Sequence, residues 1–175
     1  MAAGNGLGAA PPFVLTLEMD GASFARFDEL RRRYFPPERN LVPAHLTLFP
    51  RLPGERGRDI KALLREIAAD RKPIEVEVGA AKASERGVAV LLRSPQLQAL
   101  RDELAREFRH WLMEEDGFRP HITIQNNVGA AEARRTEREI ATSFLPRRIT
   151  GLGLHLWRYR DGPWEHVQLF RFGAG

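Results

Sequence analysis

The chain has 175 residues and no cysteine. This absence excludes disulfide bonds, cysteine nucleophiles, Cys-ligated zinc and iron–sulfur clusters. The chain also lacks any apolar run near the ~18 residues that a membrane-spanning helix needs. Residues 1–12 have no charged segment followed by an apolar run, so they do not follow the pattern of a signal peptide. We therefore expect a loose N-terminal tail over 1–12, a cytoplasmic location and no membrane partner.

Lysine is scarce as well. Only Lys61, Lys72 and Lys82 are lysines among the 27 basic residues, so the other 24 are arginines. The net charge is +4 and the isoelectric point is near 10.1. The planar guanidinium of arginine can bind two phosphate oxygens at once. The basic balance therefore favours an anionic partner, although a biased base composition in the source genome explains it equally well. A hydrophobic fraction of 43% excludes a disordered chain and, at this length, predicts a single domain over 13–173.

Hydrophobic periodicity divides the chain into two similar halves. In the first half, strands are predicted at 13–19, within 41–49 and at 74–78, with a helix after Asp20 and another at 58–69. In the second half, strands are predicted at 88–92, 121–125 and 152–156, with helices that begin at Ser94-Pro95 and at Ala130. A last strand follows at 165–172. The order of elements repeats, which indicates two similar β/α lobes.

A tetrad of the form His, apolar, Thr, apolar recurs in the central strand of each half. It occurs at His45-Leu46-Thr47-Leu48 and at His121-Ile122-Thr123-Ile124, 76 residues apart. Because alternate side chains of a strand share a face, each histidine lies on the same face as its threonine, and the apolar residues face the core. A pseudo-twofold relation between the lobes brings both His/Thr pairs to one groove.

Two histidines on one groove form a complete acid–base set. One neutral imidazole can take a proton from an attacking hydroxyl or water, and the other, protonated, can give a proton to the leaving oxygen. Threonine hydroxyls can donate to phosphoryl oxygens as negative charge develops on them. A single His-x-Thr is usually structural, but two copies at matching places of a repeat favour a shared functional site. Threonine is a poor metal ligand and neither motif has an obvious carboxylate beside it, so we expect neither a metal nor another cofactor.

These residues resemble the 2H phosphoesterase superfamily, and most closely its 2′,5′ RNA ligase-like/cyclic phosphodiesterase branch. The resemblance runs from about Phe13 to Phe172. It rests on the segments at 43–50 (PAHLTLFP), 118–126 (FRPHITIQN) and 156–159 (LWRY). It implies a bilobal α+β fold in which two antiparallel sheets are related by a pseudo-twofold axis, with a metal-free site in the groove between them. It also implies that His45 and His121 are catalytic and that Thr47 and Thr123 bind phosphate; which histidine is the acid stays open.

Aromatic side chains are further candidates for the groove. On the strand at 152–156, Leu152, Leu154 and Leu156 take one face, so His155, Trp157 and Tyr159 take the other. Aromatic rings there could stack on a base, although Trp157 could equally cover the edge of the sheet. His155 is more typical of a structural residue than of a catalytic one. Phe49 shares the predicted face of His45 and is a weaker stacking candidate.

Arg51, Arg119 and Arg158 are the candidates for additional phosphate contacts. Arg51 is predicted in a loop after the first motif, at a place where a histidine is common in the family, so it departs from the pattern. The charged run Arg31-Arg32-Arg33 falls on a helix and predicts a solvated face.

The sequence thus predicts a metal-independent phosphodiesterase, monomeric, that acts on RNA ends or nucleotides with 2′,3′-cyclic phosphates, or on 2′–5′ linked oligonucleotides. Two alternatives use the same groove. One is a 2′–5′ RNA ligase, which runs the reaction in reverse, and the other is an RNA-binding module without turnover.

Overall fold

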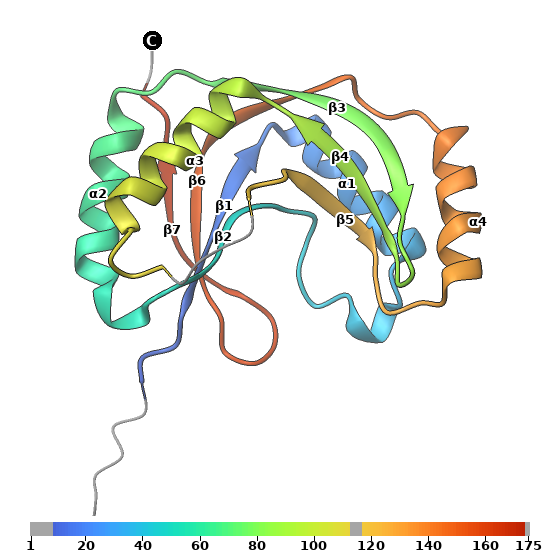
Figure 1. Ribbon diagram of the computed structural model, residues 1–175, viewed down its shortest axis with the longest axis horizontal. Coiled ribbons are helices and arrows are strands. Elements are labelled where there is room, and N and C mark those ends of the chain that lie inside the picture. The colour runs from blue at the N-terminus through green and yellow to red at the C-terminus, as the bar shows by residue number, and fades with distance from the viewer. Residues whose placement is uncertain (1–8, 113–116, 174–175) are drawn as a thin grey trace, which may run out of the picture.

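The computed structural model describes residues 9–112 and 117–173, and residues 1–8 of the expected tail lie outside this part (Figure 1). Within these residues, seven strands and four α-helices follow one another. In chain order they are β1 (Phe13–Met19), α1 (Gly21–Tyr34), β2 (Leu46–Leu52), α2 (Gly57–Ala69), β3 (Ile74–Ala83), β4 (Val88–Arg93), α3 (Pro95–Phe108), β5 (His121–Gln125), α4 (Ala130–Ala141), β6 (Arg148–Arg158) and β7 (Glu165–Arg171). Short 3-10 turns at Pro37–Arg39 and Gly54–Arg56 precede β2 and α2. None of the helices within the described ranges is long and apolar enough to cross a bilayer.

All strand pairs are antiparallel, which confirms the predicted α+β class. The strands form one sheet in the order β2-β1-β6-β3-β4-β5, with β7 also paired to β6. The sheets predicted for the two halves are thus joined rather than separate. The junction is the long strand β6, which pairs with β3 over 148–151 and with β7 over 153–158.

The sheet is strongly curled, and its curvature decides where the two motifs lie. The motif strands β2 and β5 end the strand order at opposite sides. Figure 1 shows β3 and β4 arching over, so that β5 returns toward β2. Residues of β2 and β5 come within 8 Å of each other across this arch. The curl thus brings together two strands that lie five places apart in the sheet.

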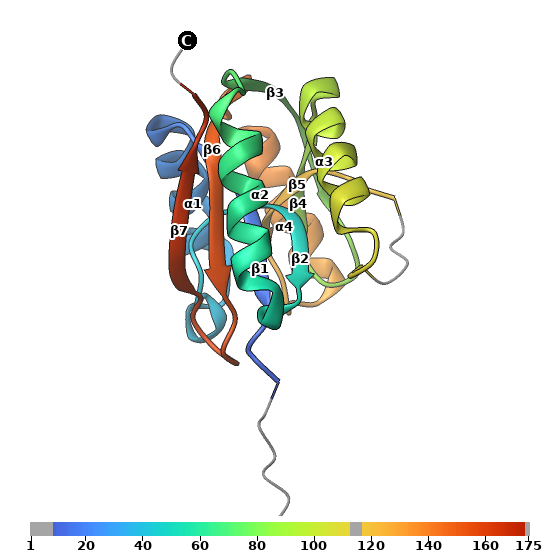
Figure 2. The ribbon, with the colours of Figure 1, turned by 90° about the vertical axis from the view of Figure 1, so that its left-hand side faces the viewer.

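The helices cover the sheet with apolar stripes. In α2, Ile60, Leu64 and Ala68 are one turn apart and buried, and the helix packs on β6 and β7 (Figure 2). Helix α1 follows β1 in the first half but packs on β5, the motif strand of the second half. The predicted caps are confirmed: Asp20 Oδ1 accepts from the backbone N of Ser23 at 3.0 Å, and Ser94 Oγ accepts from the backbone N of Leu97 at 3.1 Å.

Strand β2 is longer than the sequence indicates. The prolines after Phe49 favoured a loop from Pro50, but β2 continues to Leu52, which pairs with Phe13. Proline is tolerated because β2 is an edge strand, where its missing N–H leaves no ladder bond unmade. The register shifts twice along β2, between the partners of Phe13 and Leu15 and between those of Leu15 and Thr16. These bulges change which side chains of β2 share a face.

Candidate active site

The two motif histidines are held in the same way. His45 stands immediately before β2, and His121 is the first residue of β5. Nδ1 of His45 lies 2.8 Å from the carbonyl oxygen of Pro43, and Nδ1 of His121 lies 2.8 Å from that of Arg119. Because a carbonyl oxygen can only accept a hydrogen bond, Nδ1 is the donor in both rings. The neutral ring therefore carries its lone pair on Nε2, the nitrogen left for acid–base chemistry.

Residues of both motifs line one hollow. Thr47 and Leu48 of the first motif share a hollow of about 480 Å³ with His121 of the second, and we call it the His121 pocket. Its other lining residues are Pro50, Arg101, Gly117, Phe118 and Arg119. The threonine of one motif thus lies beside the histidine of the other.

His45 lines a second hollow of about 310 Å³, the His45 pocket. The other residues of this pocket are Thr16, Leu17, Glu18, Met19, Gly21, Phe24, Pro43, Ala44, Leu152, His155 and Trp157. Trp164, from the turn between β6 and β7, lies tilted against the imidazole with ring centroids 4.6 Å apart. The pocket therefore combines one imidazole with a mainly apolar and aromatic wall, a composition typical of small-ligand sites.

The surroundings of His45 favour a neutral ring. The ring is largely enclosed, and this burial lowers the pKa of His45 to about 4. The positive charges of Arg31 and His121 lower it further, while the hydrogen bond to Pro43 acts in the opposite direction. The influence of His121 also means that the two motif histidines lie within reach of each other's charge. Near neutral pH, His45 is therefore an unprotonated base.

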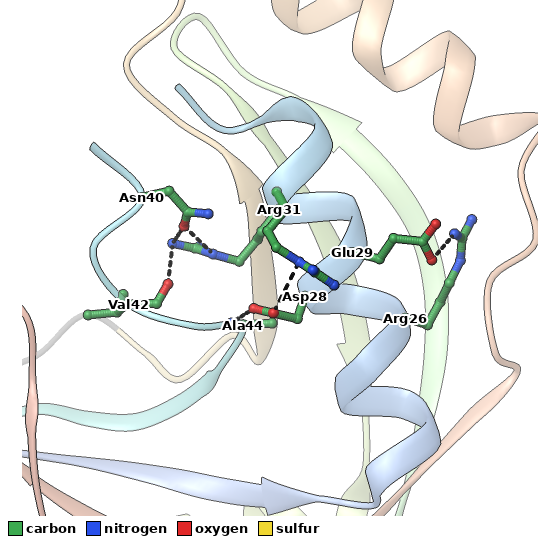
Figure 3. Close-up of polar contacts among 8 residues, drawn as sticks. Arg26, Asp28, Glu29, Arg31, Asn40, Val42 and Ala44 are labelled. Atoms are coloured by element: carbon green, nitrogen blue, oxygen red, sulfur yellow. Dashed lines mark hydrogen bonds and ion pairs between the residues drawn. The ribbon is translucent and has the colours of Figure 1, made fainter. Parts of the chain in front are cut away.

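Arg31 connects the approach to the first motif with the strand of the second. Its side chain is buried, and Nη1 donates to the carbonyl oxygen of Thr123 at 2.8 Å. Nη2 donates to the carbonyl oxygen of Val42 at 3.2 Å and to Oδ1 of Asn40 at 3.1 Å (Figure 3). Burial lowers the pKa of Arg31 to about 10, so the side chain still carries its charge. One guanidinium therefore holds backbone from both halves of the site.

The same helix holds the residue before His45. Oδ1 of Asp28 accepts from the backbone N of Ala44 at 3.0 Å (Figure 3). Asp28 also pairs with Arg32 one turn later on α1. Two residues of α1, Asp28 and Arg31, thus hold the segment that leads into His45 and β2.

Arg101 is the counterpart of Arg31 in the second half. It lies on α3, is almost fully buried, and donates from Nε to the carbonyl oxygen of Leu48 at 3.0 Å. Its guanidinium lies over the Phe49 ring at 3.9 Å from the centroid. Each motif strand is therefore held by a buried arginine on a helix of the opposite half. This exchange ties the spacing of the motifs to the packing of both halves.

His155 and Trp157 lie where the alternation of β6 places them, in the His45 pocket. Trp157 Nε1 donates to Thr16 Oγ1 at 2.9 Å, which fixes the indole. His155 Nδ1 lies 3.1 Å from Nε2 of His166 on β7. Burial lowers the pKa of His155 to about 4, with the charges of His166 and Arg171 acting in the same direction. His155 is therefore a neutral member of the pocket wall. Tyr159 is exposed beyond the end of β6.

Phe49 does not face the groove, so its predicted placement is wrong. Its side chain is fully buried and packs edge-to-face on Phe108, with centroids 5.3 Å apart. The bulge in β2 is the physical reason. Thr47 pairs with Thr16, and Phe49, two residues further along β2, pairs with Leu15, which is only one residue from Thr16 on β1. The extra residue, Leu48, turns Phe49 into the core. Phe49 supports Arg101 instead of a substrate.

The three candidate arginines lie in different places. Arg119 lines the His121 pocket, beside His121 and Thr47. Arg51 is exposed on β2 rather than in a loop, next to Pro50 of the same pocket. Arg158 faces the other side of the sheet, where its guanidinium lies over the Phe13 ring at 4.6 Å. Strand alternation places it on the face opposite Trp157, so Arg158 does not point toward the His45 pocket.

Sequence reasoning missed Arg31 and Trp164. Arg31 was grouped with Arg32 and Arg33 as a solvated run, yet it is buried while the other two are exposed. Its spacing indicates burial, because Arg31 lies four residues after Phe27 and three before Tyr34, in the apolar stripe of α1. Trp164 follows the Asp161-Gly162-Pro163 turn, and nothing in the local pattern indicates that it reaches His45.

Comparison with known proteins identifies the family. The model of the 2'-5' RNA ligase superfamily matches residues 19–163, and the chain belongs to this family of 2H phosphoesterases. A search of curated protein sequences finds no match. Among residues 9–112 and 117–173, no group of three or more His, Asp or Glu side chains is placed to hold a metal ion.

Solved structures of the same fold include two bacterial proteins. TT0787 of Thermus thermophilus is 18% identical, with a TM-score of 0.66 over 94% of this chain and 100% of that one. E. coli LigT complexed with phosphate is 17% identical, with a TM-score of 0.62 over 95% and 100% of the two chains. A further LigT structure, complexed with 3'-AMP, has a TM-score of 0.61 at 16% identity, over 94% of this chain and 99% of that one. The whole described fold, including the curled sheet, is therefore shared with phosphoesterases.

Proposed function

We propose that the protein is a metal-independent phosphodiesterase that opens 2′,3′-cyclic phosphates at RNA ends or on nucleotides. The observation that carries the proposal is the paired arrangement of the motifs. Both rings use Nδ1 to bind a carbonyl two residues earlier, which leaves both Nε2 atoms for chemistry, and His121 shares a pocket with Thr47. Membership of the superfamily and the LigT complexes with phosphate and 3'-AMP support a phosphoester substrate.

The unequal environments of the histidines support a division of labour. His45 is neutral near pH 7 and takes a proton from the attacking water through Nε2. The water oxygen forms a bond to phosphorus as the bond from phosphorus to the 2′ or 3′ oxygen breaks. The exposed His121 gives a proton to that leaving oxygen. The product is a phosphomonoester, and the two histidines exchange protons with solvent before the next cycle.

The threonines and Arg119 complete the proposed site. Thr47 lines the His121 pocket and Thr123 is partly exposed two residues after His121, so their hydroxyls can donate to the non-bridging phosphoryl oxygens. Arg119 lines the His121 pocket and supplies positive charge there. Trp157 and Trp164 give the His45 side an aromatic wall suited to a nucleobase. Their ring centroids lie 6.1 Å apart.

The proposal is tested with nucleoside 2′,3′-cyclic phosphates and 2′–5′ oligoadenylate, each incubated with the protein in excess EDTA. We expect hydrolysis in EDTA and its loss in the double variant His45→Ala/His121→Ala. The matched control is His110→Ala, because His110 is exposed and lies outside both pockets. Absence of turnover with every substrate, from folded protein, contradicts the proposal.

The same assay separates the alternatives. Joining of RNA ends through a 2′–5′ bond is the reverse reaction, with a hydroxyl in place of water, so a ligation assay with cyclic-phosphate and hydroxyl ends measures it directly. RNA binding that persists in the double variant, together with no turnover by the wild type, favours a binding module.

A further inference from the structure

A basic hollow lies on the opposite face of the sheet from the His45 pocket. Arg58, Lys61 and Arg65 occupy one face of α2, with offsets of three and four residues. Arg158, from the end of β6, lies against them, and the four side chains line a hollow of about 510 Å³. We call these four residues the basic face. Ala62 and two glycines also line the hollow and leave room between the long side chains.

The charge of this hollow is not neutralised within the described residues. Glu55 is the only acidic residue in its lining. The ion pairs found within residues 9–112 and 117–173 engage neither Arg58, Lys61, Arg65 nor Arg158. By contrast, the hollow beside Arg71 and Lys72 also contains Glu66, Asp70 and Glu103. A hollow with four basic groups and one acidic group attracts anions more strongly than its mixed neighbour.

The basic face and the His45 pocket lie on opposite faces of β6 near its end. Trp157 lines the His45 pocket on one face of the strand, and Arg158, the next residue, lines the basic hollow on the other. Tyr159 follows at the strand end with 41% of its surface exposed. In Figure 2 helix α2 lies in front of the sheet, and its first turns are near the lower ends of β1 and β6. A flexible polyanion that leaves the His45 pocket would reach the basic face around the end of the sheet, where the backbone N of Tyr159 donates to the carbonyl oxygen of Pro12.

We propose that the basic face binds the sugar–phosphate backbone of a single-stranded RNA whose 3′ end is held in the groove. The proposal rests on the proposed function and narrows the substrate to an RNA end rather than a mononucleotide. A mononucleotide fills the groove but cannot reach α2, whereas a chain of several nucleotides can. Contacts between arginine or lysine and phosphates supply sequence-independent affinity that depends strongly on salt. Tyr159 at the turn offers a surface on which one base can stack.

The test compares two substrates and two triple variants. The substrates are a nucleoside 2′,3′-cyclic phosphate and a 12-nucleotide RNA with the same cyclic end. In the variant Arg58→Glu/Lys61→Glu/Arg65→Glu we expect KM for the 12-mer to rise at least tenfold, with KM and kcat for the nucleotide unchanged. The salt dependence of KM for the 12-mer should also fall, by a slope of about 2 for three lost phosphate contacts on a single strand.

The matched control is Arg134→Glu/Arg135→Glu/Arg138→Glu on α4, which makes the same charge change on three other exposed arginines. We expect a much smaller effect on the 12-mer there. Equal effects of the two triple variants, or equal effects on the two substrates, overturn the proposal. If the wild type turns over neither substrate, the proposed activity is wrong, but the proposed RNA binding is still tested. In that case the affinity for the 12-mer is measured by fluorescence anisotropy. Equal RNA affinity of the wild type and the α2 variant then contradicts the proposed RNA binding and leaves an acidic protein as the partner.

Discussion

The two motifs occupy matching positions in the halves of the chain, but their histidines lie in different surroundings. His45 is largely enclosed: Trp164 lies against it, Arg31 is near, and its pKa is lowered to about 4. His121 opens the edge strand β5 with its ring exposed to solvent. The backbone anchors are the same in both, since each Nδ1 binds the carbonyl two residues earlier. The anchoring of Nδ1 is thus the same in both motifs, while the side chains around the two rings differ.

This difference shows how two motifs with the same backbone geometry can take different parts in one reaction. Hydrolysis of a phosphodiester needs one group that accepts a proton and one that donates it at the same moment. Two histidines in equal environments favour the same protonation state, which serves only one of these tasks. Burial of the His45 ring lowers its pKa and thereby favours the form that accepts a proton. Each prediction below tests whether the two halves really differ in this way.

The largest effects are expected from the histidines themselves. His45→Ala and His121→Ala should each lower kcat by about 10²–10⁴ on a nucleoside 2′,3′-cyclic phosphate, because each removes a general acid or base. The variants should differ on a nitrophenyl phosphodiester, whose leaving oxygen is stable without a proton. There, His121→Ala should recover most of the lost rate and His45→Ala should not. Recovery in His45→Ala instead assigns the acid to His45 and reverses the comparison.

The threonines are expected to have the next largest effects. Thr47→Val and Thr123→Val keep the shape of the side chain and remove a hydroxyl that can donate to the phosphoryl group. The loss of one such donor in a transition state lowers kcat by about 10²-fold, while KM changes little. Steady-state kinetics on the cyclic nucleotide measures both values. Thr142, at the end of α4 and outside both pockets, is the matched control: Thr142→Val should leave kcat within a few-fold. A wild-type kcat in either motif variant contradicts the phosphate-binding role.

Variants of Arg31 and Arg101 separate two roles of a buried arginine. One role is to hold a motif strand by hydrogen bonds, and the other is to lower the pKa of His45 through a positive charge. Arg31→Met removes hydrogen bonds to Thr123, Val42 and Asn40 and also a positive charge near His45. Arg31→Lys keeps the charge but loses most of these bonds. Since a nearby positive charge disfavours imidazolium, the methionine variant should raise the pKa of His45. The acidic limb of the kcat–pH profile should then move to higher pH, and kcat should fall about tenfold.

The lysine variant should lower kcat without moving that limb. Arg101→Met serves as the control, because it also removes a buried arginine that holds a motif strand. It should destabilise the fold by a similar amount, about 1–3 kcal/mol for each buried acceptor left unpaired, and leave the limb in place. If the methionine variants at positions 31 and 101 give the same pH profile, Arg31 acts on structure alone.

The positions of the two motif histidines on their strands could be predicted from local sequence patterns. The residues that pack around them in the fold could not. Alternation along a strand and the repeat of the tetrad are local properties, and they place Thr47 and Thr123 beside their histidines. The caps at Asp20 and Ser94 are local as well. The order of elements predicted two similar β/α lobes, and the family resemblance implied the antiparallel α+β class. What the pattern could not give was how the two sheets join, because that depends on the long strand β6 and its two partners.

The errors all arise from features that local periodicity does not encode. One bulge in β2 reverses the face of Phe49. The packing of α1 against β5 turns Arg31 from a surface residue into a buried one that binds Thr123. Trp164 reaches His45 through a turn in which Asp161 has a positive φ of 54°. Each of these depends on a contact between segments far apart in sequence.

The smallest effect is expected on stability in acid, and it separates His45 from His121 without any substrate. A histidine has a pKa of about 6.5 in the unfolded chain, whereas the folded protein holds the pKa of His45 at about 4. Between these values the unfolded state binds the additional proton, so the free energy of unfolding decreases as the pH falls. One such group contributes at most about 1.4 kcal/mol per pH unit. His155, whose pKa is also lowered to about 4, contributes in the same direction.

Urea unfolding followed by circular dichroism between pH 7 and pH 4 measures this slope. His45→Gln should reduce it, because glutamine does not titrate, and His45→Gln/His155→Gln should reduce it further. His121→Gln is the matched control, because it makes the same substitution on an exposed ring. An equal reduction in the variants at positions 45 and 121 shows that the folded protein treats both rings alike. The division of labour between base and acid then needs another source, because burial of His45 is the feature that distinguishes the two halves.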